Sequence, residues 1–187
     1  MGLKKILVGL VGVAALIGVS GCSSSGSVAA TVDGTVITEN TIQSSVKLMN
    51  TALAPYTLDD TYDPVGFALT GSIMEMVLTD SLGQLGVTVT DQIRDQVVAN
   101  SYAPNSIVSL LWADPGARST VTGFVDLTVA NTLIQMGNLD YDTLVTLVKA
   151  VPVSVNPRYG DWDAEKLIIT SRLANTVSGS LADPFPS

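Results

Sequence analysis

A single cysteine, Cys22, is the feature that most limits what this chain can fold into. No other cysteine occurs among its 187 residues, so no disulfide can form within the chain and stability must come from a hydrophobic core. Residues 22–187 are enough for one domain of ordinary size with a sizeable core. We therefore expect one domain that is held together by packing alone.

The segment in front of Cys22 has the pattern of an export signal. Lys4 and Lys5 precede an apolar run from Ile6 to Val19. A basic start, an apolar stretch of about 7–15 residues and small residues before the cut are typical of a secretory signal. A transmembrane helix needs about 20 apolar residues, whereas this run is shorter and contains glycines. We predict that residues 1–21 are a signal peptide.

The four residues Val19, Ser20, Gly21 and Cys22 resemble the bacterial lipobox. The resemblance implies that the Cys22 thiol receives a diacylglycerol before cleavage, and that the new N-terminus is then open to acylation, for instance by palmitate. Acyl chains contribute about 0.8 kcal/mol per buried CH2, so two of them give stable anchoring. The expected location is the extracytoplasmic face of the cell membrane; a plain secretory signal with a free Cys22 thiol is the alternative.

The net charge and the absence of histidine limit the partners that the protein can bind and the reactions that it can catalyse. Cleavage would remove two of nine basic residues and none of 17 acidic ones, which leaves a net charge of −10. Such a charge argues against nucleic acid and repels an anionic lipid surface, so the lipid on Cys22 should be what holds the protein at the membrane. The chain contains no histidine, the commonest general base and metal ligand. We expect no catalytic residue, no metal and no cofactor besides the acyl group.

The start of the mature chain predicts a tether followed by a hairpin. Residues 22–27 are mostly small and polar and should be flexible. Two short runs with strand-forming residues, Val28–Val32 and Thr35–Ile37, flank Asp33-Gly34. This dipeptide is the strongest local signal for a two-residue turn with positive φ at both positions.

The middle of the chain predicts helices from its apolar spacing and its capping residues. Thr38 should cap the first helix and Thr90 the third, and Gly86 should lie just past the end of the second, long helix. The expected helices are about Glu39–Leu53, a long apolar helix from before Phe67 to Leu85, about 91–100, about Asn105–Trp112, about Ala117–Met136 and Tyr141–Lys149.

The chain changes character after Pro152. Val153-Ser154-Val155 alternates like a strand, and Leu167–Ile169 is a second short apolar run. We place the domain at residues 28–177 and expect a loose tail over 178–187.

Two separated segments resemble one family. The run from Val28 to Glu39, VAATVDGTVITE, resembles the entry to the N-terminal domain of SurA and PrsA-type extracytoplasmic chaperones. The run from Val153 to Asp163, VSVNPRYGDWD, resembles a stretch near the C-terminal end of such proteins, notably lipoproteins of actinobacteria. Between them, Gly86-Val87-Thr88-Val89-Thr90-Asp91 resembles the family's corner between two helices.

The resemblance implies a fold and a function. The fold is mainly α with a small β-sheet, in which the N-terminal hairpin and a C-terminal closing strand at Val153–Val155 come together. The implied function is to hold unfolded or partly folded exported polypeptides. Isomerase activity is not carried over, because the chain has no room for a parvulin domain and lacks its histidines. The alternative is an accessory lipoprotein that docks to one dedicated envelope partner.

An apolar groove between helices would capture such clients. Its candidate residues are Phe67, Met74, Met76 and Met136, because thioether side chains adapt to irregular partners. Core filling is the more common use of methionine on helices this apolar, and it remains open for these residues.

Three further patterns in the sequence have residue types that could carry chemistry. Ser44 and Lys47 have the spacing of an S-x-x-K motif without its partner motifs, and a solvated helix face is the favoured interpretation. Asp59, Asp60 and Asp63 lack the spacing of a calcium loop, so a solvated loop is favoured there.

The third pattern lies near the C-terminal end. Three carboxylates lie near Trp162, those of Asp161, Asp163 and Glu165. Such a group could suggest a sugar site. Packing of Tyr159 and Trp162 onto the helices is the favoured interpretation. We expect Arg158 to donate hydrogen bonds to backbone carbonyls.

Overall fold

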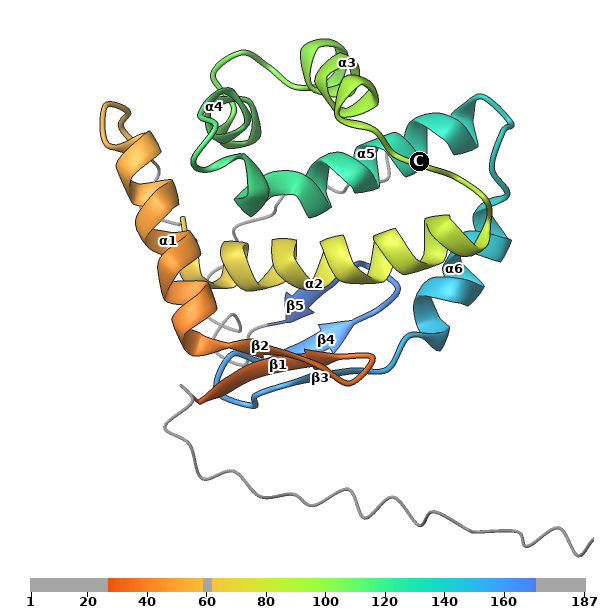
Figure 1. Ribbon diagram of the computed structural model, residues 1–187, viewed down its shortest axis with the longest axis horizontal. Helices are drawn as coiled ribbons and strands as arrows, with labels where there is room; N and C mark the ends of the chain where they lie inside the picture. Colours follow the sequence, from red (N-terminus) through yellow and green to blue (C-terminus); the bar gives the residue numbers. More distant parts are fainter. Residues whose placement is uncertain (1–26, 59–61, 171–187) are drawn as a thin grey trace, which may run out of the picture.

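The computed structural model describes residues 27–58 and 62–170 (Figure 1). Its elements, in chain order, are β1 (Val28–Val32), β2 (Thr35–Thr38), α1 (Glu39–Leu53), α2 (Pro64–Gln84), α3 (Asp91–Ser101), α4 (Ile107–Ala113), the 3-10 turn η1 (Arg118–Val121), α5 (Thr122–Gln135), α6 (Tyr141–Ala150), β3 (Val153–Val155), β4 (Asp161–Asp163) and β5 (Ile168–Thr170). The expected fold class, mainly α with a small β-sheet, is confirmed.

The first sheet joins the two ends of the described chain. Its order is β2-β1-β3, and both pairs are antiparallel. Asp33 and Gly34 have φ of 45° and 76°, as the turn signal predicted. Ala30 lies opposite Ile37 on one side and Val155 on the other. The predicted hairpin and the predicted closing strand are therefore neighbours in one sheet.

The sequence predicts only one of the two strands of the second sheet. The apolar run at 167–169 corresponds to β5, but its partner β4 was not expected as a strand, because its sequence Asp-Trp-Asp has little strand propensity. Leu167 begins this return with φ of 52° and is nonetheless buried. Burial of the Leu167 side chain offsets the free-energy cost of the left-handed backbone at this residue. No local sequence rule predicts such a compensation.

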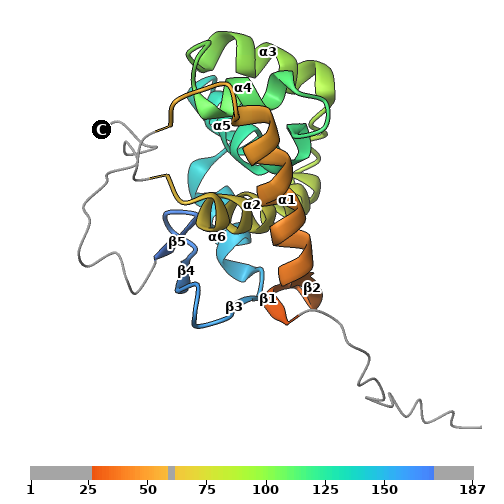
Figure 2. The same ribbon diagram turned by 90° about the vertical axis from the view of Figure 1, so that its left-hand side faces the viewer.

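Helix α2 crosses the middle of the molecule, between the sheets and the layer of α3, α4 and α5 (Figures 1 and 2). By length and composition it is the one helix in the described part of the chain that could cross a membrane, but half of its most apolar window is buried inside the fold. We interpret it as a core helix. Gly86, with φ of 73°, follows its end as predicted.

The tightest helix contact is between α2 and α5. A Cβ atom added at Gly123 would lie 2.2 Å from the carbonyl oxygen of Gly71 and 2.6 Å from the amide nitrogen of Glu75. One added at Gly71 would lie 2.9 Å from the carbonyl oxygen of Thr120. Glycine at these two positions lets the two backbones touch.

This contact also explains a difference from the expected helix over 117–136. Its first turn is the 3-10 turn η1, and α5 begins only at Thr122. Thr120 donates from its hydroxyl to the carbonyl oxygen of Ala117 at 2.6 Å, while its own carbonyl lies against Gly71. The tighter turn accommodates that approach.

The capping predictions for α1 and α3 are confirmed. The Thr38 hydroxyl accepts a hydrogen bond from the Thr41 amide at 3.1 Å, and Thr90 accepts one from Ile93 at 3.4 Å. Helix α1 therefore begins directly after the last residue of β2, and it rises from the sheet to the level of α4 (Figures 1 and 2).

Polar contacts attach α3 to α5. The Arg94 guanidinium donates to both carboxylate oxygens of Asp126, at 2.7 and 3.0 Å, and the Asp126 side chain is 2% exposed. The hydroxyl of Tyr102 lies 2.6 Å from that of Thr128 and donates to the carbonyl of Phe124 at 3.0 Å. Because α3 itself buries only Val97 and Val98, these contacts and the hydrogen bond from the Trp112 indole on α4 to Asp95 hold it in place.

Candidate functional site

Helix α1 presents the most unusual surface of the described chain. The segment from Asn40 to Leu58 contains no acidic residue and one basic residue, Lys47, in a chain with 17 acidic side chains. Within α1 only Ile42, Met49 and Leu53 are buried, so most of the helix circumference faces outward. We call the exposed side chains of this segment the α1 flank.

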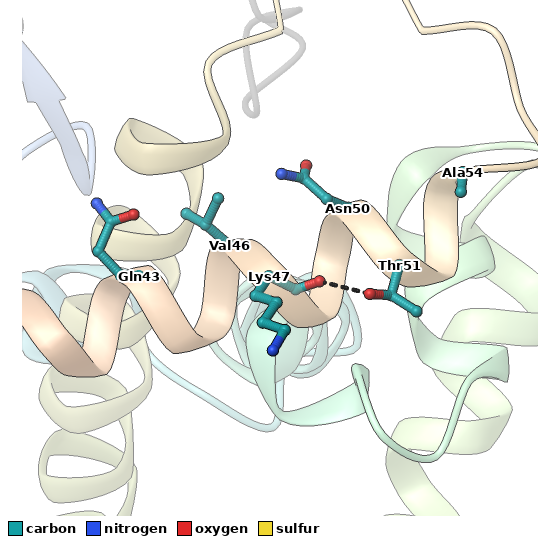
Figure 3. A pocket seen from close by; sticks show the side chains of 6 residues that line it. All are labelled: Gln43, Val46, Lys47, Asn50, Thr51 and Ala54. Carbon is teal, nitrogen blue, oxygen red and sulfur yellow. Dashed lines mark hydrogen bonds between the residues drawn. The ribbon is translucent and has the colours of Figure 1, made fainter.

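A shallow depression of about 570 Å³ runs along the α1 flank. It is lined by Gln43, Val46, Lys47, Asn50, Thr51 and Ala54. Figure 3 shows Gln43, Val46 and Asn50 pointing to the same side of the helix, whereas Lys47 extends away from them. The Thr51 hydroxyl donates to the carbonyl of Lys47 at 2.9 Å. The depression therefore offers one apolar side chain between two primary amides.

Two larger apolar side chains of the α1 flank are also exposed, although Leu48, two residues from both Val46 and Asn50, faces a different side of the helix from the depression. Leu48 on α1 is 42% exposed and Tyr56, just past the helix, is 48% exposed. Amides can donate to and accept from a peptide backbone, while valine, leucine and tyrosine supply apolar contact. The α1 flank can therefore contact a polypeptide without placing a carboxylate against it.

The second depression, of about 710 Å³ along α2, has a different chemistry. Its lining comprises Glu75, Met76, Thr79, Asp80, Gly83 and Gln84. Gln84 donates to the Asp80 carboxylate at 2.8 Å. The pKa of Glu75 is raised, chiefly by burial and then by the nearby Asp126, while Arg94 opposes the shift. Two carboxylates make this depression a poorer surface for apolar polypeptide.

The structure does not bring the four predicted groove residues together in an open groove. Met74 is 1% exposed, and it lies beside Gly123 in the α2–α5 contact. The prediction is wrong for Met74, because close approach of α5 buries that side of α2. Phe67 is half-buried, with its ring stacked on Phe124 at a centroid distance of 4.3 Å. Met76 lines the α2 depression, and Met136, 67% exposed, follows α5.

The sequence did contain the signal for the α1 flank. The absence of acidic residues over 40–58 is visible in the sequence, whereas the large apolar residues that predict a groove lie on α2 and at the end of α5. Gln43, Val46 and Asn50 recur at intervals of three and four residues, the spacing of one helix face.

The S-x-x-K pattern has the geometry of a solvated helix face. Ser44 and Lys47 are both exposed, and the Ser44 hydroxyl donates to the carbonyl of Asn40 at 2.8 Å.

Of the three loop aspartates, Asp63 accepts from the amide of Val65 at 3.0 Å at the start of α2. Asp59 and Asp60 lie outside the described residues, and no group of three potential metal ligands occurs among the residues that are described.

The acidic cluster near the C-terminal end builds a turn. Asp163 accepts from the amides of Glu165 and Lys166, at 3.0 and 3.1 Å, and Glu165 pairs with Lys149 at 2.7 Å. Trp162 packs against the core, as does Tyr159, which agrees with the packing interpretation.

Arg158 differs from its expected role. It forms an ion pair with Glu39 at the start of α1 and donates to the Tyr159 hydroxyl. It is Asn156 that donates to a backbone carbonyl, that of Val28, at 3.0 Å. The arginine therefore ties the C-terminal turn to the first helix through a carboxylate.

Four predicted features lie outside the described residues: the signal peptide 1–21, the lipobox residues 19–21, Cys22 and the tail 178–187. No family model, curated protein or solved structure matches this chain.

Proposed function

We propose that this protein is a lipid-anchored, extracytoplasmic, chaperone-like protein that holds unfolded or partly folded exported polypeptides and has no isomerase activity. The observation that carries the proposal is the α1 flank, an exposed helix surface without carboxylates on a chain that is otherwise strongly acidic. The likeness of residues 28–39 and 153–163 to SurA and PrsA-type chaperones points to the same function.

Capture on the α1 flank would be weak and unselective. The depression is shallow and is contributed by one helix, so a client buries little area and can bind in many registers. Val46 in the depression and Tyr56 just past the helix supply hydrophobic contact at about 25 cal/mol per Å² of buried apolar area, from which ordering costs are subtracted. The acidic remainder of the surface keeps a loaded complex soluble.

Suppression of aggregation tests the proposal. The mature protein with Cys22→Ser is mixed with an unfolding model protein, and light scattering is followed beside an unrelated domain of equal charge. We expect suppression at near-stoichiometric ratios, well beyond that of the control domain. Equal scattering with the two proteins would contradict general capture and would favour an accessory role with one envelope partner.

A charge variant locates the surface. Gln43→Glu with Asn50→Asp places two carboxylates in the depression without a change in side-chain size. An uncompensated charge at a contact costs about 1–3 kcal/mol, so the concentration needed for suppression should rise about tenfold. The matched control is Gln92→Glu with Gln96→Glu, which adds the same charge to exposed positions of α3. It should leave suppression unchanged, and an equal loss in the two variants would refute the assignment.

A further inference from the structure

The first sheet exposes a face that carries no charge. None of the residues in β1, β2 and β3 is charged. Thr31 lies opposite Val36 on one side and opposite Ser154 on the other, so these three side chains share the outer face of the sheet. Val36 is 50% exposed and Val28, at the end of the same sheet, is 45% exposed. This surface, which we call the outer sheet face, is a patch of hydroxyl and valine side chains that no other element of the described residues 27–58 and 62–170 covers fully, as the exposure of Val28 and Val36 shows.

The charged groups around this face largely cancel. Glu39, where α1 leaves the sheet, is paired with Arg158. In the neighbouring β4–β5 hairpin, Glu165 is paired with Lys149 and Asp163 lies 3.5 Å from the ammonium of Lys166. The turn residue Asp33, at one end of the sheet, and Asp161 in β4 are exposed as well. Most of the net negative charge of the described residues therefore lies on other surfaces, for example at Asp80 on α2 and Asp142 on α6.

The position of Cys22 relative to this face supplies the partner. Five residues lie between Cys22 and Val28, the first residue of β1, and the six steps from Cys22 to Val28 span at most about 20 Å in any conformation. A lipid on Cys22 therefore keeps the sheet end of the molecule close to the bilayer surface. Repulsion between anionic headgroups and the acidic surfaces favours the orientation in which an uncharged face is nearest the lipid.

We infer that the outer sheet face is the membrane-facing surface, with Val28 and Val36 at the level of the lipid headgroups. This inference rests on the lipid anchor of the proposed function. In the same orientation α1 rises from the sheet, and its far end at Ala54 is turned away from the bilayer (Figures 1 and 2). The α1 flank would thus project toward polypeptides that emerge at the membrane.

Site-specific fluorescence quenching tests the orientation. The full-length protein is processed in a lipoprotein-producing bacterium and reconstituted into phosphatidylcholine vesicles that contain phosphatidylglycerol and a nitroxide-headgroup lipid. Because lipidation consumes the Cys22 thiol, an added cysteine is the single site for a fluorophore. Val36→Cys and Ser154→Cys report on the outer sheet face, and Ala54→Cys and Gln96→Cys report on the opposite side. All four positions are exposed.

We expect loss of fluorescence at positions 36 and 154 and retained fluorescence at 54 and 96. Equal quenching at the four positions, or quenching only at 54 and 96, would overturn the inference while leaving the anchor intact. Labelling of the parent protein at Cys22, with no lipid mass on that residue, would show instead that the anchor itself is absent. That result would overturn both the anchoring and the orientation that depends on it.

Discussion

At the residue scale, Gly123 is the position where the fold tolerates no side chain. A Cβ atom there would lie 2.2 Å from the Gly71 carbonyl oxygen, and backbone atoms cannot move aside as a flexible side chain can. Overpacking of a core usually costs about 1–3 kcal/mol. We expect Gly123→Ala to lower the free energy of unfolding by at least about 2 kcal/mol, measured by urea unfolding with far-UV circular dichroism.

Gly83 provides the matched control on α2. It is an exposed helical glycine, and an added Cβ atom would meet nothing within 4 Å. Gly83→Ala should raise the free energy of unfolding by about 0.5–1 kcal/mol, because alanine loses less backbone entropy on folding. The same sign of change in the two variants would contradict our interpretation of the α2–α5 contact.

At the element scale, the junction of α2, α3 and α5 should make stability depend on pH. Burial, and then the Asp126 carboxylate, raises the pKa of Glu75 above its usual 4.5. The folded protein therefore binds more protons than the unfolded chain between the unfolded and folded pKa values, so stability falls as pH rises through that window. Arg94, bonded to Asp126 and Asp91, opposes the shift.

Replacement of the titrating group tests this junction. Glu75→Gln cannot ionise, so we expect it to be more stable than the parent protein at about pH 7 and similar to it at about pH 4. Thermal unfolding at the two pH values measures the difference. Asp80→Asn, an exposed carboxylate on the same helix, controls for the general loss of negative charge. A Glu75→Gln variant that is less stable at neutral pH would show that attraction to Arg94 prevails over burial.

The elements themselves differed in how far the sequence predicts them. Short-range signals placed the hairpin at Asp33-Gly34 and both ends of α1, because a turn with positive φ and a threonine cap depend on adjacent residues. The start of α5 and the strand β4 were missed. The first depends on contact with Gly71 and the second on pairing with β5, and local sequence carries neither constraint.

The candidate site was harder to predict than the fold. Met74 and Met136 are the same residue type, and the sequence predicts a helix around each. Met74 is nevertheless buried against α5, whereas Met136 is 67% exposed. Which side of α2 is covered depends on the α2–α5 crossing, so residue type alone could not separate groove from core. The carboxylate-free segment 40–58 needed no tertiary information, because its signal is its composition alone.

At the scale of the whole molecule, the charge distribution gives the described part of the protein two distinct regions without carboxylates. The outer sheet face lies near the expected anchor, and the α1 flank rises from that sheet to the level of α4 (Figure 1). Exposed carboxylates, such as Asp80, Asp91 and Asp142, lie on other helices. With the proposed lipid anchor, an acidic protein that exposes the carboxylate-free α1 flank away from the bilayer would be suited to hold polypeptides close to the membrane.

Photo-crosslinking from the α1 flank tests the central claim most directly. A photoreactive amino acid replaces Asn50 in the depression or, as control, Gln96 on α3, and each protein is irradiated with an unfolded model protein. We predict crosslinked product from position 50, reduced by excess unlabelled unfolded protein, and little from position 96. Equal crosslinking from the two positions, or none from position 50, would contradict capture on the α1 flank.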